Sequence, residues 1–398
     1  MKVTKARTYL RTHPWLTFAA DLKRAPAKLW MLLGAIQSKC EHVANAMLPP
    51  NVAKELHTLF LAKGVHATTA IEGNTLTEEQ VRARINKMLP LPESKEYQGQ
   101  EVDNIVAACN TLVAYALDDD SECQLTAEMI CKFNKQVLVD LPVEEGVVPG
   151  AIRKTSVGVA DYRGAPAEDC EFLLRQLCDW INESKPAQGD EVTQAVLQAV
   201  LAHLYLAWIH PFGDGNGRTA RLVEVLILFH ARVPTVAAHL LSNHYNQTRS
   251  EYYRQLSRAS KSGGDVFPFL QYAAQGFYDG LNGQIDTIRK FQTEMTWRDY
   301  VYSQFRDQSS VASARQRAIA LAMGLNDRRF FSSAQIRLLT PELAQMYAHK
   351  TAKTVSRDLN KLRELKLIQR TKRGHLVRAN TDLLRSFLPK RRKKSSPQ

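Results

Sequence analysis

The sequence is poor in cysteine, and it has neither a long unbroken apolar run nor an internal repeat. Its six cysteines among 398 residues form no Cys-x-x-Cys pair, which favours reduced thiols in a cytosolic protein over a disulfide framework; they are Cys40, Cys109, Cys123, Cys131, Cys170 and Cys178. No run reaches the ~18 unbroken apolar residues of a membrane helix. The most apolar stretch, Val196–Ile209, contains His203, which we expect to be a packed core histidine. The N-terminus shows no apolar signal-peptide segment. We therefore expect a cytoplasmic protein without a membrane span.

Acidic residues are scarce in the last quarter of the chain. Residues 311–398 contain 21 lysines and arginines but only 5 aspartates and glutamates, a net charge of +16 within a total of +13. The remaining residues therefore have a net charge of −3. Such an asymmetry indicates two domains with different partners.

Strand-like alternation is also rare, because apolar residues recur mostly with the 3.6-residue period of a helix. The sequence thus predicts an all-α fold. The expected helices are Pro26–Asn45, Asn51–Ala62, Thr77–Met88, Gln100–Leu117, Thr126–Leu138, Ala167–Glu183, Val192–Ile209, Arg218–Arg232, Ser250–Ser260 and Val266–Phe291. One exception, Pro149–Val159 followed by Asp161–Pro166, alternates and contains glycines, so it predicts a short β-hairpin.

The strongest functional signal is the segment from His210 to Arg221, which reads HPFGDGNGRTAR. Pro211 predicts that the preceding helix ends at Ile209. Three glycines at alternate positions predict a tight loop whose main chain a ligand can approach. A second helix that begins near Gly217 offers free N–H groups to an anion.

Four side chains of this segment suit phosphate chemistry. Arg218 and Arg221 lie in the first turns of the second helix, where they can bind phosphate oxygens. Asp214 is a hard oxygen ligand suited to Mg²⁺ that is bound through phosphates. The pKa of a histidine suits His210 to accept a proton near neutral pH. These residues together predict a site for phosphoryl-type transfer.

The segment resembles the Fic signature HPFx[D/E]GNGRxxR at every specified position, and its GNG form resembles the AMP-transferring branch of that family. The resemblance implies that His210 deprotonates a target hydroxyl and that Asp214 binds Mg²⁺. It also implies that Arg218 lies near the β-phosphate and Arg221 near the γ-phosphate of ATP. The implied nucleotide-binding residues are Phe212, Gly213, Asp214, Gly215, Asn216, Gly217, Arg218, Arg221 and Tyr253, of which Gly215, Asn216 and Gly217 form the anion hole.

Two further segments resemble parts of Fic proteins. Residues 68–74, TTAIEGN, resemble the inhibitory motif [ST]xxxE[GN], which implies that Glu72 pairs with Arg221 in the place of the γ-phosphate. The predicted hairpin resembles the flap that holds a target segment by strand addition, with Ile152, Thr155, Val157 and Val159 lining it. Tyr253 is the candidate for the ring beside adenine. Related proteins have an asparagine seven residues after this tyrosine, where this chain departs from the family with Ser260.

The basic C-terminal part resembles a winged helix through TxxRDLxxLxxLxLI, with Thr351–Leu365 as the recognition helix and a basic turn at 372–374. Contacts to the DNA backbone are expected from Lys353, Arg357, Lys361 and Arg373. The other interpretation is a module for protein interaction or dimerisation, because fold alone does not decide function.

We therefore expect a Fic helical bundle with a short β-hairpin flap, followed by a winged-helix domain. The expected domains are an N-terminal helical region with the inhibitory motif (1–96), a Fic catalytic domain (97–290), a winged-helix domain with a linker helix (291–389) and a basic tail (390–398). The expected function is ATP- and Mg²⁺-dependent transfer of AMP to a serine, threonine or tyrosine of a target protein or of the chain itself, inhibited by Glu72.

Two alternatives stay open: a DNA-binding regulator whose Fic site senses nucleotide or modifies the chain itself, and an enzyme that removes AMP or transfers another nucleotide. Duplex DNA and a homodimer partner stay open as well.

Overall fold

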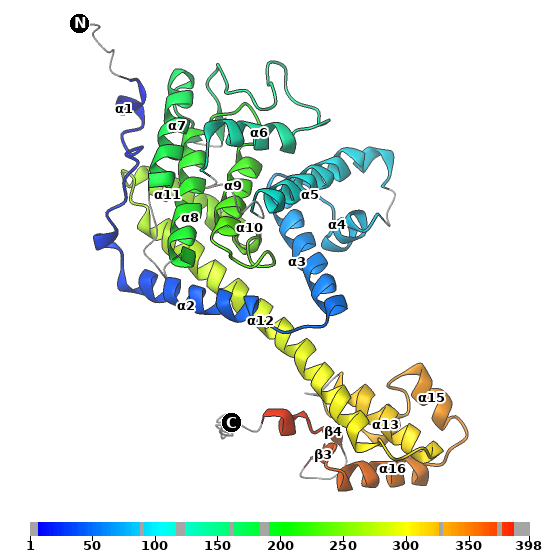
Figure 1. The fold of residues 1–398 in the computed structure, drawn as a ribbon. Helices are drawn as coiled ribbons and strands as arrows, with labels where there is room; N and C mark the ends of the chain where they lie inside the picture. Colours follow the sequence, from blue (N-terminus) through cyan, green and yellow to red (C-terminus); the bar gives the residue numbers. More distant parts are fainter. Residues whose placement is uncertain are drawn as a thin grey trace, which may run out of the picture. The chain divides into compact units, whose positions relative to one another are not determined.

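A computed structural model describes residues 7–87, 91–116, 124–159, 162–183, 191–325, 329–371 and 376–385 (Figure 1). The chain divides into two compact units, Met1–Ile285 and Asp286–Gln398. Nearly all regular structure in the described residues is helical, as the sequence predicts, and each unit also has one two-stranded antiparallel sheet.

The first unit contains the inhibitory motif, the HPFGDGNGRTAR segment and the predicted hairpin. Its elements are α1 (Tyr9–Thr12), η1 (Leu22–Arg24), α2 (Ala27–Ala44), α3 (Pro50–Ile71), α4 (Glu78–Ile85), η2 (Glu93–Lys95), α5 (Glu96–Ala116), α6 (Ala127–Val137), β1 (Gly158–Val159), β2 (Tyr162–Arg163), α7 (Ala167–Glu183), α8 (Glu191–Ile209), α9 (Asn216–His230), α10 (Leu240–Gln247), α11 (Arg249–Lys261) and the first part of α12 (Phe267–Gln304).

The second unit begins within α12. It continues with α13 (Val311–Gly324), α14 (Ser333–Ile336), α15 (Pro341–Tyr347), α16 (Ala352–Glu364), β3 (Ile368–Arg370), β4 (Val377–Ala379) and η3 (Thr381–Arg385). Phe331 bridges Val377 on the edge of the β3–β4 sheet. A separate apolar core, which includes Trp297, Ile319, Leu343 and Leu359, holds these elements together.

Helices α8 and α9 form the centre of the first unit. They pack against each other, and α9 also contacts α3, α5 and α6 (Figure 1). By length and composition α8 could cross a membrane, but 72% of its most apolar window is buried inside the fold. Core helices pass the same test, and His203 of α8 is fully buried, as expected. The α8–α9 pair therefore gives the turn between the two helices a rigid base.

The N-terminal region expected at 1–96 packs within the first unit through α3, which contacts α5, α9 and α10. Helix α3 also runs nine residues past its predicted end at Ala62. Gly64 lies inside it, where an added Cβ would clash with His239, so this glycine serves close packing between helices.

The β-hairpin lies within the predicted range, but its first strand is shorter than predicted. Its strands are Gly158–Val159 and Tyr162–Arg163, which pair antiparallel, and the carbonyl of Val157 accepts one further hydrogen bond from the Gly164 N–H (3.1 Å). Earlier in the segment, Ile152 instead bridges Phe212. The early part of the alternating pattern thus includes a pairing with a distant segment, which local periodicity cannot reveal.

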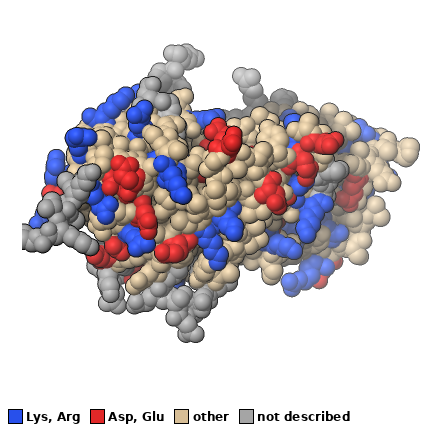
Figure 2. Space-filling view, turned by 90° about the horizontal axis from the view of Figure 1, so that it is seen from above, with Lys and Arg blue, Asp and Glu red and all other residues tan. Residues whose placement is uncertain are grey.

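Charges of both signs are interspersed on the face shown in Figure 2, where uncharged residues cover most of the surface. Five of the cysteines, Cys40, Cys109, Cys131, Cys170 and Cys178, have free thiols, and Cys123 lies outside the described residues.

Candidate active site

The turn between α8 and α9 is held in a conformation that few residues adopt. Helix α8 ends at Ile209, as predicted, and His210 has a φ of +51° in the left-handed region. Gly215, which precedes the first residue of α9, has a φ of +75°. Left-handed backbone is unfavourable for a histidine and is common at functional sites. The turn therefore directs both His210 and the first N–H groups of α9 toward one place.

Two asparagines hold the turn. The buried Asn216 side chain accepts a hydrogen bond from the Phe212 N–H (2.9 Å) and donates one to the Phe212 carbonyl (2.8 Å). Asn134 of α6 donates to the carbonyl of Asp214 (2.8 Å) and accepts from the Gly150 N–H (2.9 Å). Because Phe212 engages both ends of its side-chain amide, Asn216 offers its backbone N–H to an anion.

His210 is partly buried, and its imidazole is uncharged near neutral pH. Burial lowers its pKa to about 4, although the carbonyl of Ala207 and the charges of Glu72 and Asp214 act in the opposite direction. Its Nδ1 lies 3.4 Å from that carbonyl, which favours the tautomer with the proton on Nδ1. The other ring nitrogen, Nε2, then has a free lone pair that can accept a proton.

Arg153 fastens the segment before the hairpin to the turn. Its guanidinium donates to the carbonyls of His210 (2.7 Å), Thr155 (2.6 Å) and Ala165 (2.5 Å). Gly164 is required beside it, since a Cβ there would lie 2.8 Å from the His210 Cβ. Arg153 thus helps to fix the backbone of His210.

Glu72 lies at the N-terminal end of α9. Its carboxylate accepts a hydrogen bond from Nη2 of Arg221 at 2.5 Å, and a Cβ on Gly217 would clash with the same oxygen. Thr68 of α3 accepts two more hydrogen bonds from Arg221, through its hydroxyl (2.7 Å) and its carbonyl (3.1 Å). Burial acts to raise the pKa of Glu72, but the charge and hydrogen bond of Arg221 outweigh it and lower the pKa. An anion thus occupies the position where a helix start and an arginine favour one.

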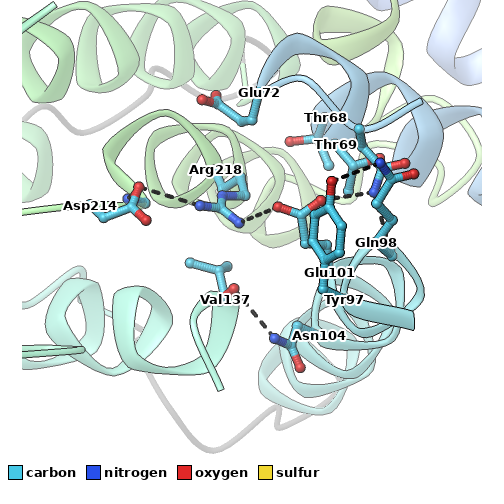
Figure 3. A network of polar contacts seen from close by, with 12 residues as sticks. Thr68, Thr69, Glu72, Tyr97, Gln98, Glu101, Asn104, Val137, Asp214 and Arg218 are labelled. Atoms are coloured by element: carbon cyan, nitrogen blue, oxygen red, sulfur yellow. Dashed lines mark hydrogen bonds and ion pairs between the residues drawn. The ribbon is translucent and has the colours of Figure 1, made fainter. Parts of the chain in front are cut away.

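Arg218 lies between two carboxylates (Figure 3). Its Nη1 donates to Glu101 at 3.1 Å and its Nη2 to Asp214 at 3.4 Å, while its buried Nε has no acceptor among the described residues. Burial raises the pKa of Glu101, against the hydrogen bond from Asn74 and the charge of Arg218. Arg218 is thus held in place with donor capacity left for a ligand.

A magnesium ion at this site would have to be held mainly by the phosphate oxygens of a bound molecule. No group of three or more histidine, cysteine or acidic side chains is placed to hold a metal ion in the described part of the chain. Asp214 is nevertheless a half-exposed carboxylate, with 47% of its side chain accessible, beside Arg218, which suits phosphates. This donor set fits Mg²⁺ held by one carboxylate together with phosphate oxygens.

The other predicted site residues vary in how closely they approach the turn. Phe212 is buried and bridges Ile152, whereas Thr155 and Val157 lie on the segment leading to β1. Val159 lies in β1 itself. On α11, Tyr253 is 39% exposed, whereas its neighbour Tyr252 is buried and bonds to His203 (2.8 Å). Tyr253 is therefore the accessible ring of the pair.

Sequence reasoning did not identify three residues that build the site, namely Glu101, Asn134 and Arg153. Each is a common residue type on a helix or loop, and each meets a partner at least 57 residues away in the chain. Thr68, by contrast, belongs to the TTAIEGN segment singled out in the sequence.

Comparisons with known proteins identify the family to which the region around this site belongs. The model of the Fic/DOC family matches residues 124–228, which run from the start of α6 into α9. The chain contains a Fic domain. The resemblance found in the sequence is thereby confirmed for the family, whereas the roles of single residues stay predictions.

Named relatives share the Fic domain and part of the region around it. Protein adenylyltransferase fic-1 of Caenorhabditis elegans is 30% identical over 241 residues, 60% of this chain and 43% of the relative. Protein adenylyltransferase Fic of Nematostella vectensis is 32% identical over 53% of this chain and 45% of its own. The chain thus spans less than half the length of these curated relatives.

Solved structures show the same fold. A fragment of Fic-1 from C. elegans has a TM-score of 0.52 at 26% identity and covers 66% of this chain and 73% of that one. A Fic family protein from Desulfovibrio desulfuricans has a TM-score of 0.55 at 22% identity over 89% of this chain and 96% of its own, which shows the fold alone.

Proposed function

We propose that this chain is a protein adenylyltransferase that moves AMP from ATP to a serine, threonine or tyrosine hydroxyl of a target protein or of itself. The observation that carries the proposal is the turn that brings an uncharged His210 together with an anion-binding helix start and two arginines. The names of the relatives point to the same activity.

The reaction requires little covalent chemistry from the protein. The target oxygen attacks the α-phosphorus, the bond from that phosphorus to the β-phosphate bridging oxygen breaks, and pyrophosphate leaves. His210 accepts the hydroxyl proton on Nε2, the nitrogen left free by the Ala207 contact. Backbone N–H groups of α9, Arg218 and Arg221 hold the phosphates and stabilise their charge.

Asp214 is the residue that would hold Mg²⁺, which neutralises phosphate charge when bound. The short segment from Ile152 to β1 lies against Phe212 and offers main-chain groups to a target segment. Tyr253, the accessible ring of α11, would lie beside adenine.

Glu72 would inhibit this reaction by occupying Arg221. Its carboxylate already satisfies the guanidinium that a γ-phosphate needs, and it lies against Gly217 at the start of α9. ATP can then bind only with its phosphates displaced from the productive position. Removal of the carboxylate frees both the helix start and Arg221.

The test is incubation with ATP labelled at the α-phosphate. We expect label on protein mainly with Glu72→Gly, little with the unmodified chain, and none with Glu72→Gly/His210→Ala. Loss of a general base should cost about 10²–10⁴-fold in rate.

Unlabelled ATP, but not UTP or GTP, should compete. Equal labelling of the first two forms would refute inhibition by Glu72, and competition by UTP alone would indicate another nucleotide. Release of AMP from a labelled protein by the unmodified chain would indicate the reverse reaction.

A second candidate function rests on the second unit, which we infer to be a winged helix that binds duplex DNA. Its order of α13, the Phe331 bridge, α14–α15, α16 and the β3–β4 hairpin is that of a winged helix. Helix α16 buries Val355, Leu359 and Leu362 and exposes an opposite face.

That exposed face is polar and basic. Lys353, Ser356, Arg357, Asn360 and Lys361 follow the three- and four-residue spacing of one helix face, and all five are exposed. Lysine, arginine and asparagine are the side chains that most often contact phosphates and base edges in the major groove. Arg373, the fourth predicted DNA contact, lies outside the described residues.

The DNA proposal is tested with the full chain and a fluorescent mixed-sequence duplex. Lys353→Ala/Arg357→Ala/Lys361→Ala should weaken binding at least about tenfold. The matched control is Arg289→Ala/Lys290→Ala/Arg298→Ala, which removes three exposed charges from α12 of the same unit. Equal effects of the two triple variants, or no binding by the unmodified chain, would refute a role of α16.

A further inference from the structure

Glu101 of α5 joins the inhibitory motif to the catalytic turn. One of its carboxylate oxygens accepts a hydrogen bond from Nη1 of Arg218 (3.1 Å), and the other accepts one from Nδ2 of Asn74 (2.8 Å) (Figure 3). The Glu101 side chain is 15% exposed and that of Arg218 is 7% exposed. A single buried carboxylate therefore contacts two segments that are far apart in the sequence.

Asn74 fixes the path of the chain just after Glu72. Its Nδ2 also donates to the carbonyl of Gln98 (3.0 Å), and its Oδ1 accepts from the Leu76 N–H (3.0 Å). Gly73 between them has a φ of +104°, so the chain turns sharply where α3 ends. Asn74 is buried and fully bonded, so its contact with Glu101 helps to set the position of the end of α3. The position of the Glu72 carboxylate, which lies at that end, then depends on the same contact.

The contact with Arg218 is the closer and more enclosed of the two that this arginine makes. Asp214 lies 3.4 Å from Nη2, and nearly half of its side chain is exposed, whereas Glu101 lies 3.1 Å from Nη1 in a buried setting. Glu101 thus holds Nη1 of the guanidinium. Nη2 faces Asp214, and the buried Nε has no acceptor among the described residues. An arginine held in this way loses less freedom when it binds a phosphate.

We propose that Glu101 is a positioning residue with two separable effects. Through Arg218 it orients the guanidinium that binds the phosphates of ATP, and through Asn74 it holds the inhibitory motif so that Glu72 reaches Arg221. The inference rests on the proposed function. It means that the same carboxylate supports both nucleotide binding and inhibition.

The two effects are separated by variants placed in two backgrounds, the unmodified chain and Glu72→Gly. Asn74→Ala should raise AMP transfer in the unmodified chain several-fold and leave it unchanged in Glu72→Gly, because inhibition is already absent there. Glu101→Ala in Glu72→Gly should weaken ATP binding about tenfold, the effect of one lost charged hydrogen bond. Affinity is measured by calorimetry with His210→Ala also present, so that no turnover interferes.

Glu101→Gln gives the sharpest outcome. Its amide oxygen can still accept from Arg218, but its NH₂ group would face the NH₂ group of Asn74. We expect it to restore most of the ATP affinity lost in Glu101→Ala while raising basal transfer as Asn74→Ala does. Asp103→Ala is the matched control, because Asp103 is another α5 carboxylate paired with an arginine, Arg84, outside the site. It should leave both measurements unchanged.

The outcomes distinguish this inference from the proposed function. If Glu72→Gly binds ATP and transfers AMP but Glu101→Ala binds ATP equally well, or if Asn74→Ala stimulates both backgrounds alike, the role of Glu101 is refuted alone. If Glu72→Gly neither binds ATP nor transfers AMP, both proposals fall. Should Glu101→Ala not fold, as judged by thermal unfolding, Glu101→Gln decides the question.

Discussion

His210 has an imidazole whose pKa burial lowers to about 4, well below the usual 6.5. Below its pKa an imidazole is protonated and cannot accept the hydroxyl proton, so a lowered pKa moves the loss of activity to more acidic pH. We expect Glu72→Gly to keep more than about half of its pH 7.5 rate at pH 5.5, whereas a pKa of 6.5 would leave about a tenth. Label transfer at fixed saturating ATP measures this ratio, with circular dichroism to confirm folding at both pH values.

Gly217 permits the close approach of any anion to α9. An alanine Cβ there would clash with the Glu72 carboxylate and lie 3.1 Å from Nη1 of Arg221. The same Cβ would crowd a phosphate, so Gly217→Ala should disturb inhibition without raising activity. In the Glu72→Gly background we expect Gly217→Ala to weaken ATP binding about tenfold by calorimetry. An increase in AMP transfer on adding Gly217→Ala to the unmodified chain would contradict this expectation.

At the scale of single residues, the sequence predicts structural features that depend only on neighbouring residues in the chain. The HPFGDGNGRTAR segment specifies a turn and a helix start through Pro211 and its glycines, and the structure has both. Glu101 and Arg153 could not be found in this way, because nothing in their neighbours marks a buried carboxylate or guanidinium. Their function depends on partners 117 and 57 residues away.

Helix α6 connects the catalytic turn to the segment that leads into β1. Asn134 makes this connection, since its amide bonds to both Asp214 and Gly150 and is buried. Asn134→Ala should leave these backbone groups unsatisfied, lower the free energy of unfolding by roughly 1–3 kcal/mol and reduce AMP transfer in the Glu72→Gly background several-fold. Thermal unfolding and label transfer measure the two effects. Gln136→Ala, which removes an amide of α6 that bonds only to Thr111 in the described residues, should have a smaller effect on both.

At the scale of elements, helix type was easier to predict than helix extent. The predicted limits of α7, Ala167–Glu183, match the structure because its amphipathic pattern is complete within the helix. Helix α3 was predicted too short, since Gly64 normally weakens a helix but here admits His239. The first strand of the hairpin was predicted too long, because Ile152 pairs with Phe212 of the catalytic turn. Each difference arises from a tertiary contact that overrides a local preference.

At the scale of the whole chain, the uneven charge distinguishes the first unit, which contains the phosphate site, from the second unit, which contains the excess of basic residues. In the first unit Arg218 and Arg221, the cations of the phosphate site, are paired with carboxylates. The net charge of +16 over residues 311–398 has no counterpart elsewhere in the sequence. An excess of exposed charge of one sign favours a polyanion as partner.

This charge predicts how DNA binding should depend on salt. Each neutralised phosphate releases counterions, so the logarithm of the binding constant falls with the logarithm of salt concentration by about 0.9 per contact. Lys353→Ala/Arg357→Ala/Lys361→Ala should therefore reduce that slope by about 2–3 between 50 and 200 mM salt, as measured by fluorescence anisotropy. AMP transfer by the same variant in the Glu72→Gly background should stay unchanged, because all three residues lie on α16 of the second unit, whereas the Fic turn belongs to the first. An unchanged slope would mean that α16 does not lie on the DNA backbone, and the charge would then have to act through other residues of the second unit.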